Sequence, residues 1–297
     1  MAVEHIPVLL QEILQTFSIA PQGLFFDGTL GGGGHAEAIL KKFKEAMVIG
    51  VDRDLEAVRR VEERLAPFKN RARVFCSAFG SLKDVLRSAG VKTVDGMLLD
   101  LGMSSYQLAD AERGFSFQQT GPLDMRMERE GETLKSRLGN TNVAELASVL
   151  RSFGEERLAN KIARAILNAF HQGVLLNTKN LADVVSGCFS AHEKNQGRLH
   201  PATRTFQALR IWINQELDQL ERFLNTAPSF LSPGGQCVIL SYHSLEDRMV
   251  KKSFKRWECE RDFSILTKKP VVPSAEEIEK NPRARSAKMR VLERKAA

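Results

Sequence analysis

Five short apolar runs, alternating with amphipathic segments, set the expected fold of this 297-residue chain. Runs that are apolar on both faces are typical of buried strands in a parallel sheet. Between them, apolar positions recur every three or four residues, as in helices that pack one face against a sheet. The predicted strands are Leu24–Asp27, Ala46–Asp52, Arg73–Cys76, Val94–Asp100 and Gln236–Ser241. This alternation predicts an α/β protein with a doubly wound parallel sheet.

The pattern changes after Gln107. Residues 108–140 are polar and irregular, and apolar residues then return at helical spacing. The helices predicted there are Asn142–Phe153, Glu155–Phe170 and Asn180–Phe189. We therefore expect an inserted helical domain at residues 108–200, between a first part of the sheet domain at 1–107 and a second part at 201–297.

The two parts of the sheet domain contain further predicted elements. A helix at residues 5–18 covers the sheet, and its His5 either lines a substrate pocket or packs and caps that helix. The second part begins with one long helix, Thr203–Asn225, and a turn at Ser232–Gly235 precedes its strand. Two weak strands, which we expect to pair antiparallel, are Phe263–Leu266 and Lys288–Leu292.

The net charge of +7 is concentrated in one segment. Residues 248–297 hold 15 Lys and Arg against 7 Asp and Glu, so the preceding residues are close to neutral. A concentrated basic surface favours a polyanionic partner such as nucleic acid, and the alternative is a solvated basic face. A helical row of Arg157, Lys161 and Arg164 has the same two interpretations, phosphate contact or a solvated face.

The cysteines and histidines argue against a metal site. The four cysteines include no Cys-x-x-Cys pair, which indicates free, mostly buried thiols in a reducing compartment, and the six histidines lack metal-ligand spacing. No stretch reaches the ~18 uncharged apolar residues of a membrane span. The first residues do not resemble a signal or transit peptide. We therefore expect a cytoplasmic protein with no membrane partner and no metal.

The stretch most indicative of function follows the first predicted strand. The strand ends at Asp27, and five glycines fall within the next seven positions before a helix begins. Such a turn presents backbone N–H groups and a helix N-terminus to a ligand. Gly31-x-Gly33-x-x-Ala36 fits the dinucleotide fingerprint, with Asp52 about 20 residues downstream for a ribose. Asp27 would repel a pyrophosphate but suits ammonium and sulfonium groups, which favours S-adenosylmethionine over NAD.

Other polar and aromatic residues share this edge of the predicted sheet. Asp27, Asp52, Phe79 and Asp100 lie at or just beyond the carboxyl ends of strands, where parallel α/β sheets bind ligands. The segment Tyr242–Arg248 follows the last predicted strand at the same edge.

Several longer stretches of the sequence, which follow one another in the same order as in a known family, indicate a specific resemblance. They are Asp27-Gly28-Thr29, Gly33-Gly34-His35, Asp52-Arg53-Asp54, Leu99-Asp100-Leu101-Gly102, Ser104-Ser105, Glu112-Arg113-Gly114-Phe115-Ser116, Gly121-Pro122-Leu123-Asp124-Met125-Arg126-Met127, Gly154-Glu155-Glu156-Arg157, Thr203-Arg204-Thr205-Phe206-Gln207-Ala208, His243-Ser244-Leu245-Glu246-Asp247-Arg248 and Asn281-Pro282-Arg283-Ala284-Arg285-Ser286. With them the chain, from about His5 to Arg294, resembles the small-subunit (16S) ribosomal RNA cytosine-N4 methyltransferases, the RsmH/MraW family.

The resemblance implies a class I S-adenosylmethionine-dependent methyltransferase with a Rossmann-like sheet and an inserted helical domain for substrate recognition. The implied target is the exocyclic N4 amine of a specific cytidine in the decoding region of small-subunit ribosomal RNA. It leaves open whether free RNA or the ribosomal subunit is the substrate, and whether the protein is a homodimer. The methyl-donor contacts that it implies are Gly33, Gly34, His35, Asp52, Phe79, Asp100 and Gln107. The chain departs from the family pattern at Leu30-Gly31-Gly32 and at Tyr242, which stands where Phe is common.

Asp100 and His243 are the candidate catalytic residues. The lone pair of a cytosine amine is delocalised into the ring, so an acceptor for an N4 hydrogen would assist transfer. Asp100 is the first candidate, and the alternative is that it only binds the donor. His243 is the second, and otherwise it stacks with Tyr242 on an extruded base. We expect His243 and Asp247 to border the target pocket, and the alternative is a buried structural pair with Arg248.

Three other functions stay open from the residues alone. A nicotinamide oxidoreductase would share the glycine fingerprint. A DNA amino-methyltransferase would carry an Asp/Ser-Pro-Pro-Tyr string where Asp100-Leu101-Gly102-Met103 stands. An RNA-binding assembly factor would keep the donor pocket without catalysis. If RNA binds through the basic C-terminal segment and the inserted helices, affinity falls steeply with salt.

Overall fold

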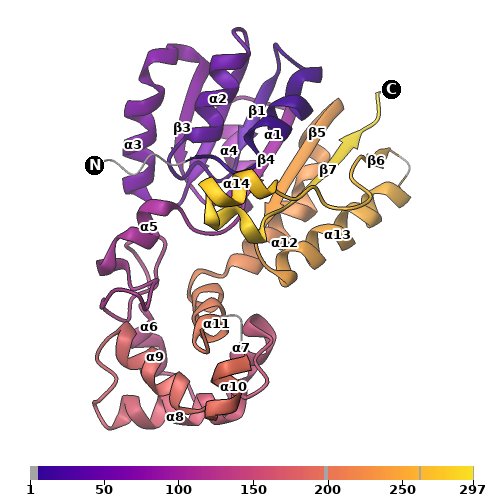
Figure 1. The fold of residues 1–297 in the computed structure, drawn as a ribbon. Coiled ribbons are helices and arrows are strands. Elements are labelled where there is room, and N and C mark those ends of the chain that lie inside the picture. Colours follow the sequence, from indigo (N-terminus) through magenta and orange to yellow (C-terminus); the bar gives the residue numbers. More distant parts are fainter. Residues whose placement is uncertain (1–5, 197–199, 261, 297) are drawn as a thin grey trace. The chain divides into compact units, whose positions relative to one another are not determined.

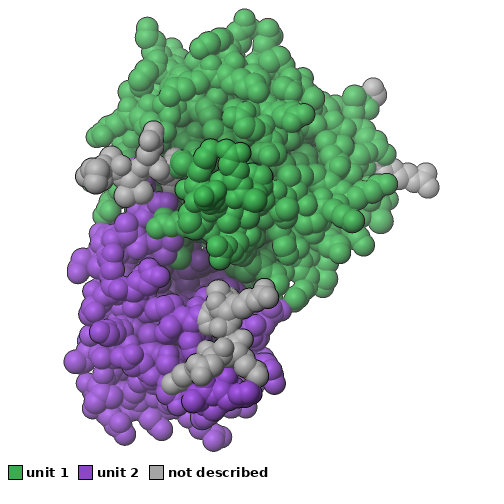
Figure 2. Space-filling model, in the orientation of Figure 1, with its two compact units in different colours: residues 1–104, 217–297 green, residues 105–216 purple. Residues whose placement is uncertain are grey.

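The structure is a computed structural model that describes residues 6–196, 200–260 and 262–296. The chain forms two compact units, residues 1–104 with 217–297 and residues 105–216 (Figure 2). The first unit contains the sheet, and the second is helical (Figure 1). His5, predicted to line a pocket or cap a helix, lies outside the described residues.

A seven-stranded sheet forms the centre of the first unit, in the order β3-β2-β1-β4-β5-β7-β6 (Figure 1). Its strands are β1 (Leu24–Asp27), β2 (Met47–Asp52), β3 (Ala72–Cys76), β4 (Val94–Asp100), β5 (Leu231–Ser241), β6 (Phe263–Ile265) and β7 (Lys288–Arg294). The first five run parallel, whereas β7 is antiparallel to both β5 and β6. The predicted α/β fold, with its parallel sheet and antiparallel last pair, is confirmed.

Alternate side chains of the strands build two separate apolar cores. Phe25 packs with buried residues of α1, α2 and α3, whereas its neighbour Phe26 packs with those of α4, α12 and α13. Because successive strand residues point to opposite faces, helices cover both sides of the sheet. The helices of this unit are α1 (Leu10–Thr16), α2 (Gly34–Lys42), α3 (Leu55–Leu65), α4 (Leu82–Ser88), α12 (Glu216–Thr226), α13 (Ser244–Cys259) and α14 (Ala275–Lys280).

The second unit consists of short helices, of which α7 packs against α8 and α11, and α8 against α9. Asparagine side chains cap the N-termini of two of these helices. The Asn142 and Asn177 side chains accept backbone N–H groups of Glu145 and Asn180, both at 3.0 Å. The helices are α5 (Ser105–Ala109), α6 (Leu134–Gly139), α7 (Val143–Gly154), α8 (Ala159–His171), α9 (Thr178–Gly187), α10 (Ala191–Gln196) and α11 (Thr203–Asn214).

Two helix predictions are corrected by left-handed residues. The single helix expected at Thr203–Asn225 is wrong, because Gln215 has a φ of 51° and separates α11 from α12. The helix expected from Glu155 begins at Ala159 instead, because Glu155 has a φ of 49° and ends α7. Since α11 packs on α7, it belongs to the second unit, which ends at residue 216, whereas the predicted insertion ends at 200.

The last parallel strand is longer than expected. The predicted turn at Ser232–Gly235 lies inside β5, which pairs with β4 from Val94 onward. The register shifts between Val94 and Gly96, so an irregularity in the ladder accommodates the extra residues.

Candidate active site

Three carboxylates lie along one edge of the sheet. Asp27, Asp52 and Asp100 end β1, β2 and β4, which are adjacent parallel strands. Asp27 is buried, with 2% of its surface exposed. Burial raises its pKa to about 6, and Asp100 and Asp52 add to this while His35 opposes it. Burial likewise raises the pKa of Asp52. The edge therefore favours a cationic ligand, which would stabilise the ionised carboxylates.

The glycine loop joins β1 to α2 and is tied to the next strand. The Gly31 N–H donates to Asp52 Oδ2 at 2.8 Å, and the Asp54 N–H donates to Oδ1 at 2.9 Å. Gly33, with a φ of 76°, precedes α2 and provides no side-chain cap, as is typical of helix N-termini that bind anions. A side chain at Gly28 would collide with Leu99, which explains glycine there.

Asp100 is held by groups from three parts of the first unit. Its backbone N–H donates to Thr29 Oγ1 at 2.6 Å, and the Tyr242 hydroxyl donates to Asp100 Oδ1 at 2.7 Å. Burial and the adjacent Asp100 raise the pKa of Tyr242 well above 10, which keeps this hydroxyl protonated as a donor. His35 Nε2 lies 3.4 Å from Asp100 Oδ2. One carboxylate oxygen is therefore occupied by tyrosine, and the other faces the histidine.

His35 is buried yet incompletely satisfied. Its exposed fraction is 6%, and neither ring nitrogen has a hydrogen-bond partner among the described residues. Buried polar atoms in proteins are normally paired. Ring nitrogens without a hydrogen bond, in a histidine that interacts with Asp27 and Asp100, therefore indicate that a polar ligand completes the site.

Phe79 and Gln107, the two other side chains predicted to contact the donor, lie in different units. Phe79 begins η3 (Phe79–Ser81) and is half-buried, with its ring edge-to-face with Phe223 at 6.1 Å. Its Cβ lies 2.9 Å from where a Cβ on Gly28 would stand, so Phe79 borders the glycine loop. Gln107 is buried on α5, in the second unit.

His243 and Asp247 have clear structural roles at the start of α13. His243 Nδ1 accepts the Glu246 N–H, and Glu246 accepts the His243 N–H in return, which is a capping box. Arg290 Nε donates to Asp247 Oδ1 at 2.6 Å. The structural pair of Asp247 is therefore with Arg290, 43 residues away in the chain, instead of the neighbouring Arg248. Burial raises the pKa of Asp247, but the hydrogen bonds and charge of Arg290 outweigh it and hold that pKa below its usual range.

The family model described as the MraW methylase family matches residues 2–295 of this chain. The chain belongs to that family. The resemblance and the implied fold are therefore confirmed, and S-adenosyl-L-methionine is the methyl donor of this methyltransferase.

Curated relatives match along almost the whole chain. Proteins named Ribosomal RNA small subunit methyltransferase H from Trichlorobacter lovleyi and Anaeromyxobacter sp. (strain K) are 43% and 46% identical. Each match covers 98% of this chain, and 98% and 97% of the relative. The crystal structure of an rRNA methylase from Streptococcus thermophilus aligns with 99% of both chains at 10% identity and a TM-score of 0.42, too low to bear on function.

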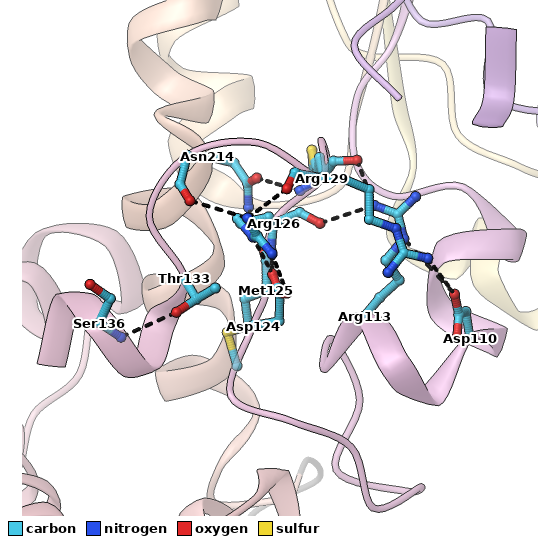
Figure 3. Close-up of polar contacts among 11 residues, drawn as sticks. Asp110, Arg113, Asp124, Met125, Arg126, Arg129, Thr133, Ser136 and Asn214 are labelled. Carbon is cyan, nitrogen blue, oxygen red and sulfur yellow. Dashed lines mark hydrogen bonds and ion pairs between the residues drawn. The ribbon is translucent and has the colours of Figure 1, made fainter. Parts of the chain in front are cut away.

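The MraW family string at Gly121–Met127 builds a polar network in the second unit (Figure 3). Arg126 donates two hydrogen bonds to the Asp124 carboxylate, both at 2.8 Å. The buried Asn214 accepts the Met127 N–H and donates to the Met125 carbonyl, both at 2.7 Å. Burial raises the pKa of Asp124, but the bonds from Arg126 outweigh it and lower that pKa. These residues stabilise the loop that precedes α6.

The remaining predicted features have mixed outcomes. Arg157, Lys161 and Arg164 are exposed, and Lys161 donates to the Cys188 carbonyl at 2.6 Å. The cysteines are free, but the expectation that most are buried is wrong, because Cys76 and Cys259 are exposed. Within the described residues no cluster of three or more His, Cys, Asp or Glu could hold a metal ion. No helix in this part of the chain is long and apolar enough to cross a membrane.

Two contacts of the site were missed by sequence reasoning. Thr29 and Tyr242 both hold Asp100, from positions 71 and 142 residues away in the chain. Thr29 lies in one of the family strings, and Tyr242 stands where the family commonly has Phe. The sequence therefore draws attention to both residues, but it does not show that both contact Asp100.

Proposed function

We propose that this chain transfers the methyl group of S-adenosyl-L-methionine to the exocyclic N4 amine of a specific cytidine in the decoding region of small-subunit ribosomal RNA. The name shared by the curated relatives supports ribosomal RNA as the substrate class. The observation that carries the proposal is the state of Asp100, which ends β4 with one oxygen held by Tyr242 and the other beside His35.

The residues of the acidic edge fit the methyl donor. When bound, S-adenosyl-L-methionine supplies an electrophilic methyl group on a positively charged sulfur. Its ammonium group and ribose hydroxyls suit carboxylates, and the unpaired nitrogens of His35 offer further polar contacts. Its carboxylate suits the N–H groups at the start of α2, which no side chain of the N-cap residue Gly33 occupies. The donor-binding residues are then Gly33, Gly34, His35, Asp52, Phe79, Asp100 and Gln107.

Asp100 is the proposed proton acceptor for the cytosine amine. By accepting a hydrogen bond from N4, Asp100 Oδ2 would help to localise the nitrogen lone pair. Its negative charge would stabilise the positive charge that develops on N4, and it would then accept the proton. Tyr242 occupies Oδ1, which fixes the plane of the carboxylate and leaves Oδ2 to act. His243 caps α13, so its Nδ1 is already engaged. We therefore assign the proton to Asp100 and place His243 at the border of the target pocket.

The second unit supplies the recognition of the RNA in this proposal. Its exposed basic row on and before α8, at Arg157, Lys161 and Arg164, suits phosphate contacts, which position RNA without reading its bases. The proposed insertion for substrate recognition, residues 108–200, contains this row. It also contains the loop at Asp124–Met127, to which Asn214 is hydrogen-bonded.

Replacing Asp100 with Asn tests its catalytic role. Asn keeps the size of the side chain and an oxygen for Tyr242, but it is a far weaker proton acceptor. We expect the rate of transfer at saturating substrates to fall by about 10²-fold or more, while the donor dissociation constant changes by less than about tenfold. Asp183→Asn, an exposed change on α9, is the matched control.

The two possible roles of Asp100 predict different results. If Asp100→Asn loses donor affinity and turnover by the same factor, the carboxylate only binds the donor. Mass spectrometry of small-subunit ribosomal RNA, made with and without this protein, locates the methylated base. A methyl group on any atom other than a cytidine N4 would contradict the proposed specificity.

A further inference from the structure

A basic pocket lies in the first unit, away from the glycine loop in the sequence. It has a volume of about 180 Å³ and lies between α13 and the β6–β7 pair. These elements are drawn side by side in Figure 1. Phe254 and Ile265 supply apolar walls, and Lys251, Lys255 and Lys268 supply three cations.

The three lysines are exposed and available. Within residues 6–196, 200–260 and 262–296, none of their ammonium groups has an ion-pair or hydrogen-bond partner. Lys251 and Lys255 are four residues apart on α13, so they share one face of the helix. Like charges at this spacing repel and destabilise a helix slightly. An anion between them would convert that repulsion into attraction.

The other charged groups of the pocket already have partners, although Glu258 keeps its negative charge. Arg290 is held by Asp247, with hydrogen bonds of 2.6 and 3.3 Å. Glu258, the acidic residue of the lining, accepts the Ile265 N–H at 3.1 Å. The three lysines thus leave the pocket with an excess of positive charge beside apolar walls, which strengthens attraction for an anion.

We propose that this pocket binds a backbone phosphate of the substrate RNA. The inference rests on the proposed function and adds a docking point to it. Lysine ammonium groups on flexible stems bind phosphate as point charges, without the planar fork that reads a base edge. Lys251 and Lys255 lie about 11 and 17 Å along α13 from Ser244, and Tyr242, just before that helix, contacts Asp100. The same RNA strand that presents a base at Asp100 therefore has phosphates within reach of the pocket.

Neutralising the pocket lysines tests this docking point. In the triple variant Lys251→Gln, Lys255→Gln, Lys268→Gln, we expect the Kd for unmethylated small ribosomal subunits to rise about tenfold. The salt dependence of log Kd should lose about one unit of slope, corresponding to one phosphate contact. Donor Kd, melting temperature and turnover at saturating subunits should match those of the wild type.

A second triple variant controls for the loss of charge. Lys44→Gln, Lys83→Gln, Lys92→Gln removes the same three charges from exposed positions elsewhere in the first unit. If both triples change the Kd and the salt slope equally, the pocket is not a phosphate site. Restoring charge with arginine at the three pocket positions should recover binding, and failure to do so would also overturn the proposal.

The failure of this inference differs from failure of the proposed function. A wild-type protein that binds the donor but methylates no small-subunit ribosomal RNA would contradict the proposed function itself. Wild-type methylation that is insensitive to the pocket lysines contradicts only the phosphate site. A parallel titration with naked small-subunit ribosomal RNA shows whether the contact is made by RNA, and a loss seen only with subunits would assign the pocket to a ribosomal protein and overturn the proposal.

Discussion

Among single residues, Asp27 is a buried carboxyl whose ionisation lowers the stability of the ligand-free protein. Burial raises its pKa from 3.8 to about 6. Below pH 3.8 the carboxyl is protonated in both the folded and the unfolded chain. Between pH 3.8 and about 6 only the unfolded chain releases the proton, so the free energy of unfolding falls by about 3 kcal/mol over this range. A bound cation would recover part of that loss.

The variant Asp27→Asn should separate stability from donor binding. Asn has no charge to bury and keeps an oxygen for the Thr29 N–H. We expect the free energy of unfolding of the ligand-free protein at pH 7 to rise by as much as about 3 kcal/mol, and its decline between pH 4 and 6 to disappear. Donor affinity should weaken in the same variant.

Urea unfolding at pH 4, 5, 6 and 7 measures the first effect, and calorimetric titration with the donor measures the second. Asp183→Asn, which is exposed, should keep the wild-type pH dependence. Parallel pH curves for Asp27→Asn and wild type would show that Asp27 is not the group that titrates.

At the scale of helices and strands, the break between α11 and α12 depends on one strained residue. Gln215 is exposed and has a φ of 51°, a conformation that costs a non-glycine residue roughly 1 kcal/mol or more. Glycine relieves this strain at an entropic cost in the unfolded chain. We therefore expect Gln215→Gly to stabilise the protein by about 0.5–1 kcal/mol and Gln215→Val to destabilise it.

Chemical denaturation of both variants tests this expectation. If glycine and valine shift the midpoint in the same direction, side-chain contacts and not backbone strain decide the effect. Unchanged donor binding in both variants would confine the effect to the helix break.

The same elements show what local sequence could and could not predict. The inner parallel strands β1, β2, β4 and β5 were predictable because most of their residues are buried, so each is a nearly continuous apolar run. The edge strand β3 has no buried residue, and its shorter apolar run was the weaker signal. The break at Gln215 was not, because apolar residues keep helical spacing across it and the left-handed conformation of Gln215 leaves no mark in that spacing.

The candidate site was predictable to a similar extent. Asp27, Asp52 and Asp100 follow from the rule that parallel strands end at one edge. Their partners do not follow from any local pattern. Tyr242 reaches Asp100 across 142 positions, and Arg290 reaches Asp247 across 43. Such pairs depend on the order of strands in the sheet, which spacing along the chain does not encode.

At the scale of the whole molecule, the first unit holds the complete sheet and both of its apolar cores. It also holds every predicted donor-binding residue except Gln107. We expect a chain in which a Gly/Ser linker replaces residues 105–216 to fold and bind S-adenosyl-L-methionine more weakly, through the loss of Gln107. Transfer to ribosomal subunits should be abolished, because the proposed recognition residues are gone.

Circular dichroism, calorimetric titration with the donor and transfer of a labelled methyl group measure these three properties. The variant Gln107→Ala in the full chain is the control for donor affinity. Methyl transfer that survives the replacement would show that the second unit is not needed to recognise the substrate.

The position of β7 has a consequence for how this protein reaches its native state. β6 precedes β7 in the chain, yet it joins the sheet only through β7, which lies between β5 and β6. Until residues 288–294 dock, the buried strand β5 offers a bare, apolar edge to any other nascent chain. Variants in which substitutions weaken the packing of β7 would therefore form insoluble aggregates, and little folded protein would be available for an assay. Low yield of such variants would then report a failure of folding, and it would say nothing about their chemistry.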